Sequence, residues 1–131
     1  MILLDTNVCI GILRADQSVL AAYARNRGNV AISAMTVGEL FFGAEKSQNN
    51  GRNRQLVEQF VAVMPIVQTD NGIMRRFGVE KARLQAAGTP IEDADILIAA
   101  TALSLAAPLA TGNTRYFSRF PDLELSNWFL P

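Results

Sequence analysis

Short apolar runs alternate with longer stretches of helical spacing along this sequence, and this alternation restricts the fold more than any other feature. The runs are roughly four residues long, and an apolar run of that length bounded by turn residues is typical of a buried strand. Strands are expected at residues 1–5, 30–33, 64–67 and 109–111, with 124–126 as a fifth candidate.

The stretches between these runs carry the apolar spacing of amphipathic helices. Helices are expected at residues 7–13, 18–25, 36–45, 53–61, 71–87 and 91–106, with a turn at 26–29 and a loop at 47–52. Strands that alternate with helices pair in parallel through right-handed crossovers. The sequence therefore predicts one α/β domain over residues 1–131, a three-layer α/β/α sandwich with a short, mainly parallel central sheet.

Histidine is absent and Cys9 is the only cysteine, which removes several kinds of chemistry. Without an imidazole there is no histidine general base, no Ser-His-Asp triad and no histidine-ligated zinc. A single cysteine forms no internal disulfide, and Cys9 stands among apolar neighbours typical of a core position. Any hydrolysis by this chain must use carboxylates, a metal ion or both.

The charge is balanced, with 12 basic and 12 acidic residues, so no global positive field indicates a nucleic-acid partner. Basic residues occur in local groups, each of which is either a solvated helix face or a phosphate contact. The longest nearly apolar run, residues 96–109, is too short and too alanine-rich to span a membrane, and no secretory signal opens the chain. These features favour the cytoplasm and no membrane partner.

Asp5 ends the first expected strand. Open parallel sheets bind ligands beyond the carboxyl ends of their strands, so Asp5 is a candidate metal ligand on a rigid element. The alternative is structural, because an aspartate at this place also caps the helix that follows.

Glu39 follows the second expected strand, in the first turn of the helix expected at 36–45. That turn also lies at the carboxyl edge of the sheet, so Glu39 is a second candidate ligand. Thr36 and Glu39 have the spacing of a capping box, however, in which the glutamate would bind the backbone amide of Thr36 instead.

Three acids, Glu92, Asp93 and Asp95, open the most apolar helix of the chain. First-turn acids compensate a helix dipole by about 0.3–1 kcal/mol each, but three exceed what a cap needs. Asp95 shares a helix face with Ile98 and Ala102, and an acid aligned with buried apolar residues is costly unless it is paired or binds a metal. We therefore favour Asp95 over Asp93 and expect Glu92 to face solvent.

Together these acids predict a single site, because segments far apart in sequence meet at one end of a parallel sheet. Carboxylates at such close range repel one another, and this repulsion raises their pKa values. A divalent cation bound between them relieves the repulsion. A set of oxygen ligands without histidine or cysteine suits Mg²⁺ or Mn²⁺ rather than zinc. The candidate catalytic and metal-binding residues are Asp5, Glu39 and Asp95, with Asp93 as a further ligand candidate.

The sequence resembles the PIN-domain family, and within it the VapC-type ribonuclease toxins of bacterial and archaeal toxin–antitoxin pairs. The resemblance lies in residues 2–7 (ILLDTN), 33–43 (SAMTVGELFFG), 95–102 (DILIAATA) and 109–117 (LATGNTRYF), followed by Trp128. Each motif alone is weak. Four motifs in order, at fitting separations, are fairly specific and span essentially the whole chain.

The resemblance implies a metal-dependent endoribonuclease that hydrolyses RNA phosphodiester bonds and leaves a 5′-phosphate and a 3′-hydroxyl. It assigns the metal to Asp5, Glu39 and Asp95. It places four further residues along the site: Thr6, Thr111, Asn113 and Tyr116. Many relatives carry a fourth acid where this chain has Tyr116, so a second metal would be weak or absent, or Asp93 would take that role. The resemblance also implies a homodimer and a cognate antitoxin that blocks the site.

Other functions stay open on the residues alone. A phosphoacceptor signalling module or a haloacid-type phosphatase also uses acids at a sheet edge, but Asp5 is followed by Thr6 and Asn7 where either would need a further acid. A non-catalytic PIN-like domain that binds RNA or protein is the other alternative.

Two binding surfaces are expected as well. An antitoxin helix would lie on an apolar groove formed by residues 10–13 and 41–42 with Phe60, although the same residues are also typical of a core. Arginine and lysine around the pocket would hold the RNA, and this binding should weaken as salt rises.

Overall fold

The central sheet has five strands in the order β3-β2-β1-β4-β5. The computed structural model describes residues 1–131, and its strands are β1 (Ile2–Leu4), β2 (Val30–Ser33), β3 (Ile66–Val67), β4 (Leu109–Thr111) and β5 (Leu125–Asn127). Every strand pairing is parallel. The predicted parallel sheet, including its fifth strand, is confirmed.

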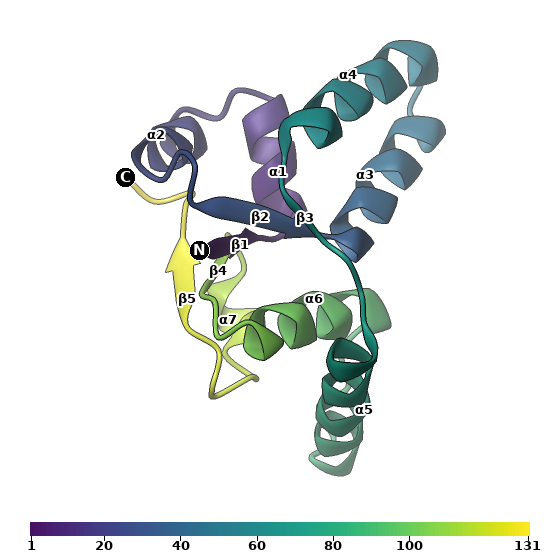
Figure 1. Cartoon of the computed structure of the whole chain (residues 1–131), viewed down its shortest axis with the longest axis vertical. Helices are drawn as coiled ribbons and strands as arrows, with labels where there is room; N and C mark the ends of the chain where they lie inside the picture. The colour runs from purple at the N-terminus through teal and green to yellow at the C-terminus, as the bar shows by residue number, and fades with distance from the viewer.

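Helices cover both faces of this sheet. They are α1 (Thr6–Leu13), α2 (Gln17–Arg25), α3 (Ala34–Lys46), α4 (Asn50–Val63), α5 (Asn71–Ala86), α6 (Asp93–Ser104) and the single turn α7 (Thr114–Phe117). Helices α1 to α4 lie on one side of the sheet and α5 to α7 on the other (Figure 1), which confirms the three-layer arrangement. None of these helices has the length and apolar character needed to cross a membrane.

Alternate residues of the strands supply two separate cores. Leu3 and Leu109 pack with buried residues of α5, α6 and α7, whereas Leu4 and Ala110 pack with those of α1 to α4. Successive side chains of a strand point to opposite faces, and here both faces are covered. The strand segments are therefore continuously apolar instead of alternating with polar residues.

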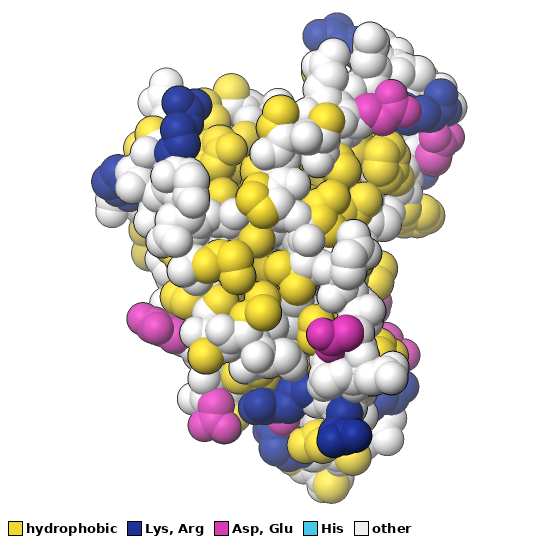
Figure 2. Space-filling model, in the orientation of Figure 1, with side chains coloured by type: hydrophobic (Ala, Val, Ile, Leu, Met, Phe, Trp, Pro, Cys, Tyr) yellow, Lys and Arg dark blue, Asp and Glu magenta, His cyan; other side chains and the backbone are white.

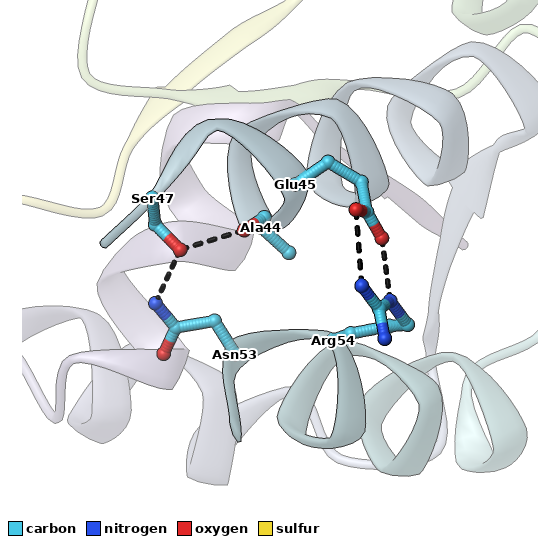
Figure 3. A network of polar contacts seen from close by, with 5 residues as sticks. All are labelled: Ala44, Glu45, Ser47, Asn53 and Arg54. Carbon is cyan, nitrogen blue, oxygen red and sulfur yellow. Dashed lines mark hydrogen bonds and ion pairs between the residues drawn. The ribbon is translucent and has the colours of Figure 1, made fainter. Parts of the chain in front are cut away.

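The expected loop at 47–52 is wrong in its second half, because α4 begins within it. Two links join the end of α3 to the start of α4 (Figure 3). Arg54 Nη2 donates to Glu45 Oε2 at 3.0 Å, and Asn53 Nδ2 donates to Ser47 Oγ at 2.8 Å. These contacts between the helices stabilise a helical start that the polar composition of the segment did not indicate. Helix α7 was not predicted either, since a single turn is too short to show a helical period.

Strand β1 lies in the middle of the sheet, with β2 on one side and β4 on the other. The chain runs outward from β1 through β2 to β3, and then returns to form β4 on the opposite side of β1. This change of direction leaves a crevice beyond the carboxyl ends of β1 and β4, where open α/β sheets bind ligands. Asp5 follows β1 directly and Thr111 ends β4.

Candidate active site

A pocket of about 680 Å³ opens at this crevice. Three acidic side chains line it: Asp5, Glu39 and Asp95. Three of the other expected site residues line the same pocket: Thr6, Asn113 and Tyr116. The fold therefore brings the three acids named by the sequence, from segments far apart in the chain, to one pocket.

Asp5 both caps a helix and faces the pocket. It is the N-cap of α1, where its Oδ1 accepts a hydrogen bond from the backbone N–H of Val8 at 2.8 Å. Its Oδ2 accepts a hydrogen bond from Thr111 Oγ1 at 2.5 Å, across the β1–β4 pairing. The side chain is only 4% exposed, so its orientation is strongly fixed. The carboxylate that caps α1 therefore also lines the pocket.

Glu39 does not form the capping box that its spacing from Thr36 allowed. Helix α3 begins two residues earlier than expected, and Ser33 is its N-cap, with Ser33 Oγ accepting from the N–H of Thr36 at 3.1 Å. Glu39 Oε1 instead accepts a hydrogen bond from Thr6 Oγ1 at 2.6 Å. The glutamate therefore reaches across to the residue that follows Asp5, which leaves it available to the pocket.

Asp95 lies in the first turn of α6 and is half-buried. Burial raises the pKa of Asp95, the charge of Glu39 raises it further, and the Tyr116 hydroxyl, which donates towards this carboxylate, opposes both effects. Burial also raises the pKa of Asp5; the hydrogen bonds from Thr111 and Val8 oppose that shift, and the charge of Asp95 adds to it. The acids therefore destabilise one another's charged forms when no cation is bound.

The donor set suits a hard divalent cation. Asp5, Glu39 and Asp95 offer carboxylate oxygens, which are the ligands that such cations prefer. A bound cation would also offset the repulsion between these negative groups. The spacing is more open than in a formed metal centre, because no three acidic, histidine or cysteine side chains of the structure lie close enough to hold one ion. The fit to a metal rests on the chemistry of the donors and their shared pocket.

Two of the expected site residues lie outside this pocket. Asp93 is exposed, and its Oδ1 forms an ion pair with Lys81 Nζ at 3.0 Å, so the structure does not bring it to the other acids. Thr111 is fully buried and contacts two pocket residues from the interior of the protein. Its hydroxyl donates to Asp5 and accepts from the backbone N–H of Asn113 at 2.9 Å. Glu92 is exposed, as expected.

Tyr116 occupies the position at which the family resemblance would place a fourth acid. Its hydroxyl accepts a hydrogen bond from the backbone N–H of Glu92 at 3.4 Å, at the start of α6, and lowers the pKa of Asp95. The guanidinium of Arg119 lies over its ring, 5.4 Å from the centroid. Tyr116 therefore connects α7 with the helix that carries Asp95.

The pocket continues from the acids between α1 and the α3–α4 hairpin. Its apolar wall includes Ile10, Leu13 and Phe42, as the groove prediction expected. Phe60 is buried in the core and Phe41 packs against it, so for these two residues the core alternative is correct.

Among the pocket residues that sequence reasoning missed are Asn7 and Arg14. Asn7 belongs to the first motif, so the motif itself could have indicated it. Arg14 is the C-cap of α1, and its place beside the pocket depends on the length and direction of that helix. No pattern in the sequence carries that information.

Basic side chains on one face of the molecule form separate local groups. In the view of Figure 2 they gather over α2, at the tip of the α3–α4 hairpin and over α5. This distribution agrees with the balanced charge of the composition.

Comparison with known proteins gives one consistent picture. The PIN domain model matches residues 2–123. A protein named ribonuclease VapC2, from Haemophilus influenzae, is 36% identical over 127 residues, and one named tRNA(fMet)-specific endonuclease VapC, from Shigella flexneri, is 35% identical over 127 residues. Each alignment covers 96% of both chains.

The fold comparison agrees with the sequence comparison. A chain in the crystal structure of DNA-bound VapBC from Salmonella typhimurium superposes with a TM-score of 0.91 at 32% identity, covering 97% of this chain and 97% of that one. The similarity therefore extends over the whole fold and includes every segment that contributes to the pocket.

Proposed function

Since this chain belongs to the PIN-domain family and is a ribonuclease of the VapC type, the toxin of a toxin–antitoxin pair, we propose that Asp5, Glu39 and Asp95 form its metal-dependent active site. The ion would be Mg²⁺ or Mn²⁺, and the bond hydrolysed a phosphodiester of RNA. The observation that carries the proposal is the meeting of the three carboxylates in one pocket at the switch point of the sheet.

The chain's own residues orient two of these carboxylates. Thr111 and the N–H of Val8 each bond one oxygen of Asp5, and Thr6 bonds one oxygen of Glu39. A carboxylate oxygen has two lone pairs, so each bonded oxygen keeps one for a cation. When bound, the cation would activate a water molecule and neutralise the charge that develops on the phosphate.

Tyr116 would orient the third carboxylate. Its hydroxyl lowers the pKa of Asp95 and accepts the N–H of Glu92 at the start of the same helix, α6. A phenol is a poor ligand for Mg²⁺ beside carboxylates, and Asp93 is paired elsewhere with Lys81. We therefore propose that the site depends on one firmly held ion, with a second ion recruited only together with substrate.

The long pocket suits the antitoxin as well as the substrate. Its apolar wall, which includes Ile10, Leu13 and the 66%-exposed Phe42, leads directly to the acidic end. An amphipathic helix could cover this wall and place a basic side chain among the three carboxylates. We propose that the cognate antitoxin inhibits in this way, that the toxin acts as a homodimer, and that it acts in the cytoplasm.

A cleavage assay tests the enzyme. Transfer RNA is the first substrate to try, because the Shigella flexneri relative is named for its action on tRNA(fMet). End-labelled RNA should be cut by the wild type in Mn²⁺, remain intact in EDTA, and remain intact with Asp5→Asn. Asp122→Asn is the matched control, since Asp122 is a carboxylate 84% exposed and lies outside this pocket. Asp93→Asn should behave like that control.

Each alternative has its own outcome in this assay. Cleavage that persists in EDTA, or with Asp5→Asn, would contradict the metal-dependent site. RNA binding by the wild type without cleavage in any divalent cation would favour the non-catalytic PIN-like domain. Loss of activity with Asp93→Asn would favour Asp93 as a further metal ligand.

A further inference from the structure

A second pocket, of about 520 Å³, adjoins the candidate active site. The two pockets share four lining residues: Asn7, Ile10, Arg14 and Asn113. They are therefore neighbouring depressions, one on each side of the short region where the start of α1 meets the segment after β4. Nothing in the proposed metal site uses the second pocket.

Arg14 is the cation between the two pockets. It is exposed, it ends α1 as the C-cap, and it takes part in none of the ion pairs or cation–π contacts of the structure. The only acid of the second pocket is Asp16, which caps α2 by accepting the N–H of Val19 at 3.1 Å and forms no ion pair with Arg14. The guanidinium is therefore free to bind an anion from solution.

The far wall of the second pocket is aromatic. Phe129 lies against the backbone of Gly112, and a Cβ added at Gly112 would lie 2.6 Å from Phe129 Cδ2. The neighbouring Trp128 is buried in the core, and the N–H of Phe129 donates to Asn127 Oδ1 at 2.9 Å, so the ring is held in place. Phe129 is only partly buried and keeps part of its surface towards the pocket.

A free arginine, an aromatic surface and two amide side chains are the groups that bind single-stranded RNA. Arginine binds the phosphate, an aromatic ring stacks on a base, and amides hydrogen-bond to base or ribose edges. The amides here are those of Asn7 and Asn113, which stand between the pockets. This pocket also begins next to the carboxylates where the phosphodiester would be cut.

We propose that the second pocket receives the nucleotide next to the scissile phosphate, with Arg14 contacting a backbone phosphate and Phe129 stacking on the base. The proposal rests on the proposed function, since it takes RNA to be the substrate. It makes Arg14 and Phe129 positioning residues, which determine how RNA lies across the carboxylates without taking part in the reaction.

RNA binding tests this without relying on cleavage. In the Asp5→Asn background, fluorescence anisotropy with a labelled single-stranded RNA gives Kd at several salt concentrations. Adding Arg14→Gln should raise Kd about tenfold and make the slope of log K against log salt less steep by about 0.7. Arg25→Gln, which removes an exposed arginine outside both pockets, should change neither quantity.

The stacking contact has a separate measurement. Phe129→Leu keeps an apolar side chain over Gly112 but removes the aromatic face, so Kd should rise about five- to twentyfold with an unchanged salt slope. Phe129→Tyr should restore binding. In the active enzyme, Arg14→Gln and Phe129→Leu should raise KM far more than they lower kcat, because both contacts are made equally in the ground state and in the transition state.

The outcomes separate this inference from the proposed function. If the wild type cuts no RNA, the proposed function fails. If the wild type cuts RNA while Arg14→Gln keeps the same Kd, salt slope and KM, the second pocket does not bind substrate and this inference alone is wrong. Weaker binding of the antitoxin by Arg14→Gln, with RNA binding unchanged, would overturn it in favour of a protein partner.

Discussion

Thr111 Oγ1 donates a hydrogen bond to Asp5 Oδ2 across 106 positions of sequence, and both side chains are buried. Thr111 ends β4 and Asp5 directly follows the neighbouring strand β1, so the pairing of these strands sets the position of the central carboxylate. The same hydroxyl accepts the N–H of Asn113, which continues the connection into the pocket wall.

Thr111→Val should therefore destabilise the protein and weaken the site together. The isosteric change leaves a buried carboxylate oxygen without its donor, which should lower the free energy of unfolding by about 1–3 kcal/mol. Urea unfolding measures this change. Thr101→Val is the control: that hydroxyl is also buried but donates to the carbonyl of Leu97 within α6, away from the pocket, so RNA cleavage should be lost only with Thr111→Val.

Loss of the Thr6 hydroxyl should change the orientation of Glu39 more than the stability of the protein. Its hydroxyl donates to Glu39 Oε1 at 2.6 Å and lies 3.1 Å from Thr36 Oγ1, in a partly buried position. Thr6→Val should weaken Mn²⁺ binding and cleavage by roughly 10- to 100-fold, as expected for loss of a group that orients a ligand. Thr6→Ser keeps the hydroxyl and should restore most of both. Equal activity of the valine and serine variants would show that the orientation of Glu39 does not depend on this contact.

Stability without metal should fall as pH rises. The pKa values of Asp5 and Asp95 are raised above their ordinary value of 3.8, chiefly by burial. Below pH 3.8 both groups are protonated whether the chain is folded or unfolded. Above it the unfolded chain loses protons first, so the folded state is progressively disfavoured until the raised pKa values are passed.

Thermal unfolding in EDTA from pH 3 to pH 8 measures this, with Asp5→Asn as the comparison. The difference in Tm between Asp5→Asn and the wild type should grow in favour of the variant as pH rises. At pH 7, Mn²⁺ should raise the Tm of the wild type and leave that of Asp5→Asn nearly unchanged, because only the intact set of carboxylates binds the ion. A difference that stays constant with pH would contradict the burial effect.

Gly112→Ala should destabilise the protein because of one neighbour. The added methyl would lie 2.6 Å from Phe129 Cδ2 and 2.8 Å from Cε2, so the ring must move, at a cost of about 1–3 kcal/mol. In a Phe129→Ala background the same substitution should cost much less, which a double-mutant cycle by urea unfolding detects. Gly78→Ala, in the open and exposed middle of α5, should instead stabilise by about 0.5–1 kcal/mol.

The layers of the fold could be predicted because the strand segments are buried on both faces. Leu3 and Leu4 enter different cores, so each strand segment had to be apolar throughout and stood out from the helical stretches. Helix starts were harder to place. The beginning of α3 depends on Ser33, a strand residue that is also an N-cap, and this is why the competing assignment of Glu39 to a capping box was wrong.

The site residues differed in how far the sequence could place them. Asp5 and Asp95 follow from position, one at the end of a strand and one on the buried side of a helix's first turn. The position of the Asp93 side chain could not be predicted from the sequence, because only the structure shows that it pairs with Lys81. Arg14 and Phe129 reach the second pocket through the direction of α1 and the path of the chain's last residues, which depend on tertiary packing.

The span between Asp5 and Thr111 has a consequence for synthesis of the protein. A nascent chain emerges from the ribosome with β1 long before β4, since 106 positions separate Asp5 from Thr111, and Trp128 completes the core still later. Until these residues are free to fold, Asp5 lacks the adjacent strand β4 and its hydroxyl partner Thr111. The ribosome that makes this nuclease has therefore translated past β4 and Trp128 before the molecule can cut RNA.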